Sequence, residues 1–521
     1  MATINNIVGT QFAIGTLEYN DGKDQYATSS YPATPQEVRM EPALIVYAAD
    51  RDDISKTLIY AKERGIAVAI RTGGHQYSGA SSTVAPNIQL DLSTTFRKLP
   101  DDRSFFEIGG KGFVRTSVSW ELLEFSKFLQ DNHCFVPHGQ CATVHLGGHV
   151  QSGGYGQLGR SFGLLADQVI SLEVVLHDGT FKEVTKERDP DLFFGILGGS
   201  PGNFAVITHF TTKVFLDTDY PGARGLKSIY WYEKSTLQRL LGILAAMSDN
   251  EDFPRNYDYC VSILSERADL FGYFPGIEDQ VKAAHPHIFG PDGEAIWPKM
   301  IVVYAQWVPF SPADKYDQTV QNWFESIRKG ALLDPEVVQD PMSIMAGRWL
   351  FNNRREFDLP YVKSTRLSDS KTLTKDGWVD WIAGRIENII DTENGLSLSA
   401  QIQPFGGKNS QFFQNRDNGT AHSFRNSTVC ATLDAFYKDG HKAAAETWHN
   451  TNALEGVGPK GFFSKTDRRV LWGSFDNYDL DAVWNLYYDD LAKYERLRKI
   501  RKAADPHGVL TPNTFSVKRA A

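Results

Sequence analysis

Three glycine-rich loops constrain the fold of this chain more strongly than any other feature of its sequence. The first, RTGGHQYSG, begins at Arg71 and directly follows an apolar run at residues 66–70. The second, GQCATVHLGGHVQSGGYGQLGRSFG, covers residues 139–163, and the third, GGSPGN, covers residues 198–203. A glycine-rich loop can direct several backbone N–H groups at one anion, such as a pyrophosphate. We therefore expect the first loop to form part of an anion-binding site.

The residues before the first loop have the pattern of a strand, a helix and a second strand. Residues 43–47 (ALIVY) predict a short buried strand. Asp52 and Asp53 then open a helix, and Gly65 ends it. Residues 66–70 (IAVAI) predict the second strand, which runs directly into RTGGHQYSG. The segment is thus predicted to be a βαβ unit that ends in the first glycine-rich loop.

The rest of the chain divides by composition and pattern. Residues 169–177 alternate as a strand before an Asp-Gly hairpin signal, and FAVITHF follows the third loop. From about residue 217 to 455 the runs YDYCVSIL, MIVVYAQWV and LSLSAQIQPF predict an antiparallel sheet, with helices near 235–247 and 443–450 on one face. The last 65 residues predict a helix with apolar positions at Val483, Tyr487, Leu491, Tyr494 and Leu497.

Length and composition set further bounds. A chain of 521 residues exceeds what one hydrophobic core usually serves, so we expect an α+β fold in two lobes. The net charge of −9 argues against nucleic acid, which needs a concentrated basic surface. No run approaches the roughly 20 apolar residues of a membrane span, and the N-terminus lacks the pattern of a signal peptide. The four cysteines show no metal-binding spacing. We therefore expect a cytoplasmic protein without a metal site and without a membrane partner.

Two motif matches lack the sequence context that their functions require. Gly154, Gly156 and Gly159 satisfy GxGxxG, but the dinucleotide fingerprint needs a strand directly before it, and here a run of Gly and His precedes it. Residues 198–202 satisfy GxSxG, the nucleophile elbow of hydrolases. In that motif the residue after the serine donates its backbone N–H, and here it is Pro201, which has none. Neither a Rossmann site nor a serine hydrolase is expected.

His75 and Cys141 are the candidate reactive residues. Taken alone, His75 is typical of a turn histidine and Cys141 of a small buried apolar residue. Their positions in two different glycine-rich loops favour a functional role for both.

These loops carry a resemblance to a known family. RTGGHQYSG, GQCATVHLGGHVQSGGYGQLGRSFGLLADQV and GGSPGNFAVIT resemble the FAD-binding elements of the vanillyl-alcohol oxidase superfamily, with its PCMH-type FAD-binding domain, and more narrowly of its berberine bridge enzyme-like branch. The resemblance covers about residues 40–215 and resumes at DNYDLD and ADPHGVLTPNTF. It implies an FAD that is bonded through its 8α-methyl carbon to His75 and through C6 to Cys141. Such double attachment would make the flavin a stronger oxidant.

The resemblance also implies a domain organisation and a set of cofactor-binding residues. An FAD-binding domain would comprise residues 1–217 and 456–521, with a substrate-binding domain at residues 218–455 above the flavin ring. Val144 matches a position that gates oxygen, which favours an oxidase. Besides His75 and Cys141, the cofactor-binding residues would be Arg71, Thr72, Gly73, Gly74, Gln76, Tyr77, Ser78, Gly79, Gly139, Thr143, Val144, Gly147, Gly148, Gly153, Gly154, Gly156, Val206 and Asn513.

Tyr478 matches the tyrosine that acts as the catalytic base in many relatives. A free tyrosine has a pKa of about 10, so this role needs a phenolate stabilised by charge or hydrogen bonds. The alternative is a core tyrosine. Gln403 and Asn477 are expected to contact the substrate, and Gln403 replaces an acidic residue that is usual in the carbohydrate oxidases. His145 stands where small residues are usual.

The resemblance therefore predicts an FAD-dependent oxidase. It would oxidise a hydroxyl group of a sugar or another alcohol by hydride transfer to covalent FAD, with O2 as acceptor and H2O2 as product. Two alternatives stay open. One is a biosynthetic oxidase or oxidative cyclase that acts on a polyketide, an alkaloid or a glycosylated natural product. The other is a flavin-carrying binding protein without significant turnover.

Overall fold

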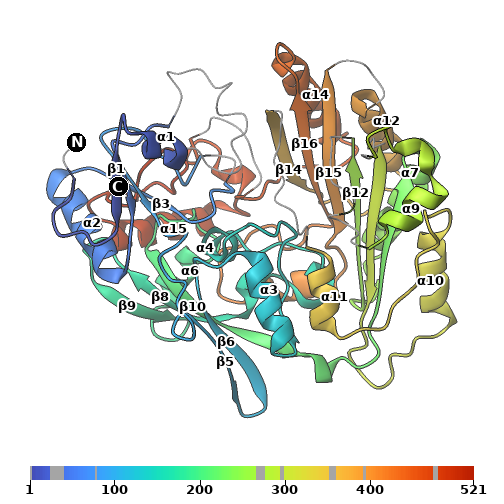
Figure 1. The fold of residues 1–521 in the computed structure, drawn as a ribbon, viewed down its shortest axis with the longest axis horizontal. Coiled ribbons are helices and arrows are strands. Elements are labelled where there is room, and N and C mark those ends of the chain that lie inside the picture. Colours follow the sequence, from blue (N-terminus) through green and yellow to red (C-terminus); the bar gives the residue numbers. More distant parts are fainter. Residues whose placement is uncertain are drawn as a thin grey trace.

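The computed structural model describes residues 3–23, 40–76, 79–265, 271, 276–293, 299–350, 360–390, 395–472 and 479–521. Three sheets organise these residues. Two of them lie in one lobe with both termini, and the third lies in the other lobe with most of the longer helices (Figure 1). The predicted α+β architecture with two lobes is confirmed.

The first sheet carries the predicted strand-helix-strand unit. Helix α2 (Arg51–Arg64) connects two of its strands in sequence. The Asp50 carboxylate accepts a hydrogen bond from the backbone N–H of Asp53 at the start of the helix, and Gly65 ends the helix at a φ of 63°. The two strands of the unit are not neighbours, because β4 lies between them and is parallel to both. In order across the sheet, the strands are β1 (Thr10–Ala13), β2 (Leu44–Tyr47), β4 (Ile88–Asp91) and β3 (Val68–Arg71).

The second sheet contains the predicted hairpin. Strands β8 and β9 are joined by a turn in which Gly179 has a φ of 85° and the Asp178 carboxylate accepts from the N–H of Thr180. The sheet strands are β5 (Arg103–Ile108), β6 (Lys111–Ser117), β10 (Val206–Leu216), β8 (Val169–Val175) and β9 (Phe181–Thr185), with β7 (Cys134–Phe135) paired to β10. The helices around it are α3 (Leu122–Asp131), α4 (Leu146–Gln151), α5 (Gly159–Phe162) and α6 (Pro190–Ile196).

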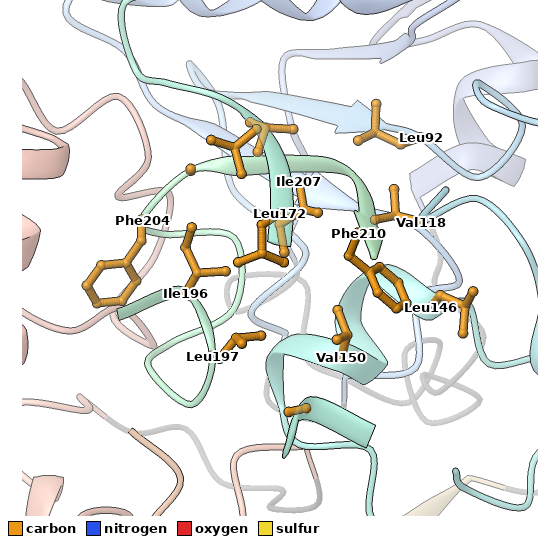
Figure 2. Close-up of a cluster of buried hydrophobic side chains, with 14 of the residues drawn as sticks. Leu92, Val118, Leu146, Val150, Leu172, Ile196, Leu197, Phe204, Ile207 and Phe210 are labelled. Atoms are coloured by element: carbon orange, nitrogen blue, oxygen red, sulfur yellow. The ribbon is translucent and has the colours of Figure 1, made fainter. Parts of the chain in front are cut away.

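A compact apolar cluster supports this lobe (Figure 2). It brings Leu146 and Val150 of α4 against Ile207 and Phe210 of β10, and all four side chains are buried. Ile207 also lines the pocket described below. The core of the lobe is therefore also the floor of its pocket.

The third sheet is antiparallel, as predicted from the central runs. Its strands in order are β11 (Arg224–Trp231), β13 (Met300–Trp307), β12 (Tyr257–Leu264), β15 (Leu396–Pro404), β16 (Val429–Tyr437) and β14 (Tyr361–Leu367). The predicted helices near 235–247 and 443–450 are α7 (Lys234–Asp249) and α14 (Lys442–Gly456). They share one apolar core with the sheet and with α10 (Gln318–Arg328) and α12 (Trp378–Ile390) (Figure 1).

The two faces of β15 differ in chemistry. Leu398, Ala400 and Ile402 belong to the apolar core that the sheet shares with its helices. Residues 399, 401 and 403 alternate with them and line the pocket. Successive side chains of a strand point to opposite faces, so one strand serves both the core and the pocket.

The predicted C-terminal helix begins later than its apolar pattern indicated. The structure has a short 3-10 turn at Trp484–Leu486 and a separate helix, α15, at Leu491–Ala504. The Asp490 carboxylate accepts from the N–H of Lys493 and caps α15, which fixes its start. Including Val483 and Tyr487 in one helix was therefore wrong.

The C-terminal segment returns to the first lobe. The N–H of Val68 in β3 donates to the carbonyl of Val509 at 2.7 Å, and the Asn203 amide donates to the carbonyl of Leu510. The domain boundaries at 217/218 and 455/456 stay predictions. No helix among the described residues is long and apolar enough to cross a membrane.

Candidate functional site

A pocket lies between the glycine-rich loops of the first lobe and the inward face of the third sheet. The first loop contributes a continuous part of its wall at residues 70–76, and the second contributes separate residues between 139 and 155. Leu92, Val118 and Ile207 form an apolar portion, whereas the portion from the third sheet is polar apart from Ala400. The pocket therefore has an apolar floor and a polar roof.

Most of the residues singled out from the sequence meet in this pocket, although their roles stay predictions. Tyr77, Ser78, Asn477 and Tyr478 lie outside the described residues. The wall does not include Gly79, Thr143, Gly153, Gly154, Gly156, Val206 or Asn513. The wall includes Arg71, Thr72, Gly73, Gly74, His75, Gln76, Gly139, Cys141, Val144, Gly147, Gly148 and Gln403.

His75 and Cys141 reach the pocket from two separate loops. His75 lies four residues beyond the end of β3, and its Nε2 is 3.4 Å from the hydroxyl oxygen of Thr143. The segment that follows Cys141 is fixed by backbone hydrogen bonds, in which Leu123 donates to Ala142 and Leu122 donates to Val144. The fold therefore holds the imidazole and the thiol at the wall of one cavity.

Side-chain contacts fix both ends of the His75 loop. The Gln76 amide donates to the carbonyl of Leu471, beside Trp472 in the pocket wall. Beyond the loop, the Asn513 amide donates to three carbonyls, the shortest contact being 2.8 Å to Ser82. Asn513 thus contributes to the pocket indirectly, because it fixes the backbone that follows the His75 loop. The Arg71 guanidinium points elsewhere, since it donates to Gly22, Lys23 and Ser82.

Two glycines of the long tract serve different purposes. A Cβ added at Gly148 would meet no atom within 4 Å, so this residue presents bare backbone to the open pocket. A Cβ added at Gly156 would lie 1.7 Å from the carbonyl oxygen of His138. Gly156 is therefore required for chain packing, whereas Gly148 leaves room for a bound group.

His149 is a pocket residue that the sequence argument did not select. Its Nε2 accepts a hydrogen bond from the backbone N–H of Gly139 at 3.1 Å, two residues before Cys141. Burial, with a smaller effect from His138, lowers the pKa of His149 to about 3, so the ring is neutral and can accept. Its place in the LGGH run was the only sequence signal.

The polar roof consists of side chains on β14, β15 and β16. The Lys363 ammonium donates to both carboxylate oxygens of Asp434, at 2.8 and 3.1 Å, and both side chains are buried. Gln403 is also buried, near the end of β15, and lines the pocket; its contact with a substrate stays a prediction. Lys363 and Asp434 were not selected from the sequence, since their pairing depends on strand register.

The wall of the pocket fits FAD. Bare backbone at Gly148, apolar side chains on the floor and N–H-rich loops suit a flat heteroaromatic ring that carries a pyrophosphate. Several polar side-chain atoms of the described wall residues are buried without a hydrogen-bond partner, among them Gln140 Oε1, His145 Nδ1 and Gln403 Oε1. Such atoms are unusual in native proteins and mark a wall shaped for a polar ligand.

Comparison with known proteins agrees with this interpretation. Residues 42–185 match the FAD binding domain family. Berberine bridge enzyme-like 12 of Arabidopsis thaliana is 33% identical over 191 residues, which cover 36% of this chain and 34% of that protein. Glucooligosaccharide oxidase of Sarocladium strictum is 27% identical over 260 residues, or 47% of this chain and 50% of that protein. The match thus spans a third to a half of these relatives.

Solved structures share the fold over nearly the whole chain. Wild-type BBE-like 1 of Physcomitrella patens superimposes with a TM-score of 0.70, at 16% identity and with 98% of both chains covered. A glucooligosaccharide oxidase from Acremonium strictum, described as carrying a 6-S-cysteinyl, 8α-N1-histidyl FAD, gives 0.69 at 16% identity, again with 98% of both chains covered.

The chain thus contains an FAD-binding domain at residues 42–185. It is similar in sequence to berberine bridge enzyme-like 12 and in fold to BBE-like 1, which agrees with the resemblance that its glycine-rich loops carry.

Proposed function

We propose that this protein is an FAD-dependent oxidase. It oxidises a hydroxyl group of a sugar or another small alcohol and passes the electrons to O2, which yields H2O2. The observation that carries the proposal is the meeting of His75 and Cys141 in one pocket under a polar roof. A sugar-oxidising relative, the glucooligosaccharide oxidase, adds support.

His75 and Cys141 would each hold FAD by a covalent bond. Support comes from their positions in the wall of one cavity and from the doubly linked FAD of the Acremonium enzyme. When bound, FAD supplies the acceptor for the hydride of the substrate. The glycine-rich loops would bind the pyrophosphate, with Gly148 facing the bound group.

The remaining residues would prepare the substrate. Leu92, Val118 and Ile207 exclude water from the floor, and Gln403 orients the substrate from the roof. Tyr478 would take the proton of the reacting hydroxyl at its phenolate oxygen, a role that rests on the sequence alone. The neutral amide of Gln403 cannot assist a tyrosine base as a carboxylate would, so the phenolate would need stabilisation from other groups.

Acid denaturation tests the covalent attachment. The purified yellow protein is precipitated in acid, and flavin absorbance is measured in pellet and supernatant for wild type, His75→Ala, Cys141→Ala and the double variant. Flavin should stay in the pellet for wild type and each single variant and be released by the double variant. Release by wild type would contradict the double link.

Oxidase activity is tested in the same preparation. Sugars and simple alcohols are added without oxygen, and the loss of flavin colour is followed in a stopped-flow instrument. Admission of air should restore the colour and release one H2O2 for each substrate oxidised. A flavin that no compound bleaches would favour the binding protein without turnover. Bleaching by aromatic or polyketide substrates alone would favour the biosynthetic oxidase.

A further inference from the structure

The pocket-facing side of the third sheet is a ladder of polar side chains in register. Ser399 of β15 lies opposite Asp434 of β16, which lies opposite Lys363 of β14. The next row is Gln401, Thr432 and Thr365, and the two threonine hydroxyls lie 3.2 Å apart. Five of these six side chains line the pocket, and Thr365 lies behind Thr432 without lining it.

The row with Lys363 and Asp434 contains the strongest charges of the roof. Its two side chains are 4% and 5% exposed, and both line the pocket. Among the described residues of the wall, Asp434 is the one carboxylate. Stripping two charges of water costs several kcal/mol, and apolar residues of equal volume often stabilise a fold as well or better. The same strands use apolar side chains on their other face. Fold stability alone therefore does not account for this pair.

The geometry of the pair leaves Asp434 able to bind more donors. A carboxylate has about four acceptor positions, and Lys363 occupies one on each oxygen. Two positions on the Asp434 carboxylate remain, and they lie on the pocket side of the sheet. Trp472 lies beside the pair, with its ring centroid 5.6 Å from the Lys363 ammonium, and provides a flat apolar surface in the same wall.

A ligand matched to this roof carries neighbouring hydroxyl groups and one apolar face. An apolar or aromatic ring placed here would strip water from a charged pair without replacing its hydrogen bonds, which is costly. A ring polyol would donate two hydroxyl protons to Asp434 and pack its C–H face on Trp472.

We propose that the Lys363–Asp434 pair is the specificity site of the pocket and selects substrates with two adjacent hydroxyl groups, that is, carbohydrates or cyclic polyols. The proposal rests on the oxidase function proposed above, whose substrate class it narrows. Asp434 binds the hydroxyls directly, and Lys363 positions its carboxylate.

The test measures each protein variant with each of a set of related ligands. Asp434→Asn and the double variant Lys363→Met/Asp434→Leu are compared with wild type. Thr365→Val is the matched control, because Thr365 is equally buried on the same strand, one row away, and does not line the pocket. The double variant removes the pair without leaving a lone buried charge, so it is expected to fold. Acid-stable flavin content verifies each preparation.

The probes are aldohexoses, their monodeoxy forms, and benzyl alcohol as a monohydroxylated aromatic. Flavin bleaching gives kcat/KM, and perturbation of the flavin spectrum by the same sugars under non-reducing conditions gives Kd. In wild type and Thr365→Val, loss of one of the two recognised hydroxyls should lower kcat/KM roughly 10- to 100-fold, the range for a hydrogen bond to a charged group. In Asp434→Asn and the double variant, this discrimination should largely vanish.

Each outcome decides between the two proposals. Equal loss for all substrates in Asp434→Asn, or benzyl alcohol as good as the hexoses in wild type, overturns the specificity site and leaves the oxidase function standing. Sugar binding that depends on Asp434 without any bleaching overturns the oxidase function and supports the site. Absence of both binding and bleaching overturns both.

Discussion

Thr143 is the residue whose contact bears most directly on His75. Its hydroxyl oxygen lies 3.4 Å from Nε2 of the imidazole. When Nε2–H donates to this oxygen, the lone pair of the ring resides on Nδ1, and the contact also orients the ring. Thr143 would therefore influence which nitrogen of His75 is available for the proposed bond to FAD and how the imidazole ring is oriented.

We expect Thr143→Val to slow attachment of FAD to His75. In a Cys141→Ala background, where His75 is the remaining attachment residue, loss of orientation should slow the reaction roughly tenfold. Thr143→Ser keeps the hydroxyl and should react at the parent rate. The measurement is the acid-stable flavin absorbance over time after FAD is added to apoprotein. Equal rates for the valine and serine variants would exclude the orienting role.

A second expectation at this scale concerns Tyr478. If its phenolate takes the substrate proton, Tyr478→Phe should lower the rate constant of anaerobic flavin reduction roughly 10²- to 10⁴-fold. Acid-stable flavin should remain as in wild type, because the residue does not attach the cofactor. Unchanged reduction in the phenylalanine variant would assign the base to another residue.

Some of the candidate site residues could be selected from the sequence, and others could not. His75, Cys141 and Gln403 could be selected because each belongs to a short local motif, and all three line the same pocket. Lys363 and Asp434 could not, since they are 71 residues apart and meet only through the pairing of β14 with β16. Periodicity predicts strands but not their partners.

At the scale of elements, Glu173 joins three of them. It lies on β8, and its carboxylate accepts from Arg115 on β6, with one contact of 2.9 Å, and from Arg51 on α2. Burial by itself would raise the pKa of Glu173, but the hydrogen bonds and charge of Arg115, with His209 and Arg51, outweigh it and lower the pKa. The contact thus connects the helix of the first sheet to the second sheet.

The sign of the resulting pH dependence follows from this shift. A carboxylate whose folded pKa is lowered contributes stability above its unfolded pKa, about 4.3, and loses it as the pH falls through the folded value. Glu173→Gln should therefore lower the free energy of unfolding at pH 7 by roughly 1–2 kcal/mol, an amount reduced by partial solvent screening. The difference from wild type should shrink below about pH 4.

Urea denaturation at pH 7 and at pH 3.5 measures this difference. Glu183→Gln is a suitable control, because Glu183 lies on the neighbouring strand β9 and makes an exposed ion pair with Arg188. A Glu173 effect that is constant with pH would show that packing, rather than charge, causes the loss.

Elements were predictable wherever their signals were local. The hairpin at Asp178-Gly179, the end of α2 at Gly65 and the strands of the third sheet all follow from turn residues and alternation within a few positions. The start of α15 was missed because an apolar repeat continues back to Val483, whereas the Asp490 cap sets the boundary. A capping side chain decides such an end more firmly than periodicity does.

On the scale of the whole molecule, a buried ion pair links the segment between β15 and β16 to the 3-10 turn Leu165–Gln168, which follows the second glycine-rich loop. Arg425 donates to both carboxylate oxygens of Asp167, at 3.1 and 2.6 Å, and the side chains are 3% and 1% exposed. The amides of Asn415 and Asn418 also donate to this carboxylate. Asp167 is thus a point where segments of both lobes converge.

We expect Arg425→Met to be strongly destabilising. Removing one partner leaves a buried carboxylate without its counter-charge, which typically costs about 3–5 kcal/mol. Arg416→Met is the matched control, since Arg416 is largely exposed beside Asp417 and should change stability by less than about 0.5 kcal/mol. Urea denaturation of the flavin-loaded proteins compares the two. Equal stabilities would contradict a role for the pair in joining the lobes.

The arrangement of strands within the sheets was beyond sequence reasoning. Alternation predicted the central strands, but β4 lies between the two strands of the βαβ unit, and β14 lies at the edge of the third sheet beside β16. These neighbours are set by packing across long loops, which no local pattern encodes. The α+β class and the two lobes could be predicted because the chain is too long for one hydrophobic core and because its composition changes along the sequence.

The division of labour on β15 and β16 bears on how new enzymes arise from this scaffold. Ser399, Gln401 and Gln403 present polar side chains to the pocket, whereas Leu398 and Ile402 pack in the core that the sheet shares with its helices and do not line the pocket. A lineage can therefore exchange pocket positions one at a time and acquire new substrates while its framework stays intact. Positions that set substrate specificity and positions that stabilise the core therefore alternate along the same strand.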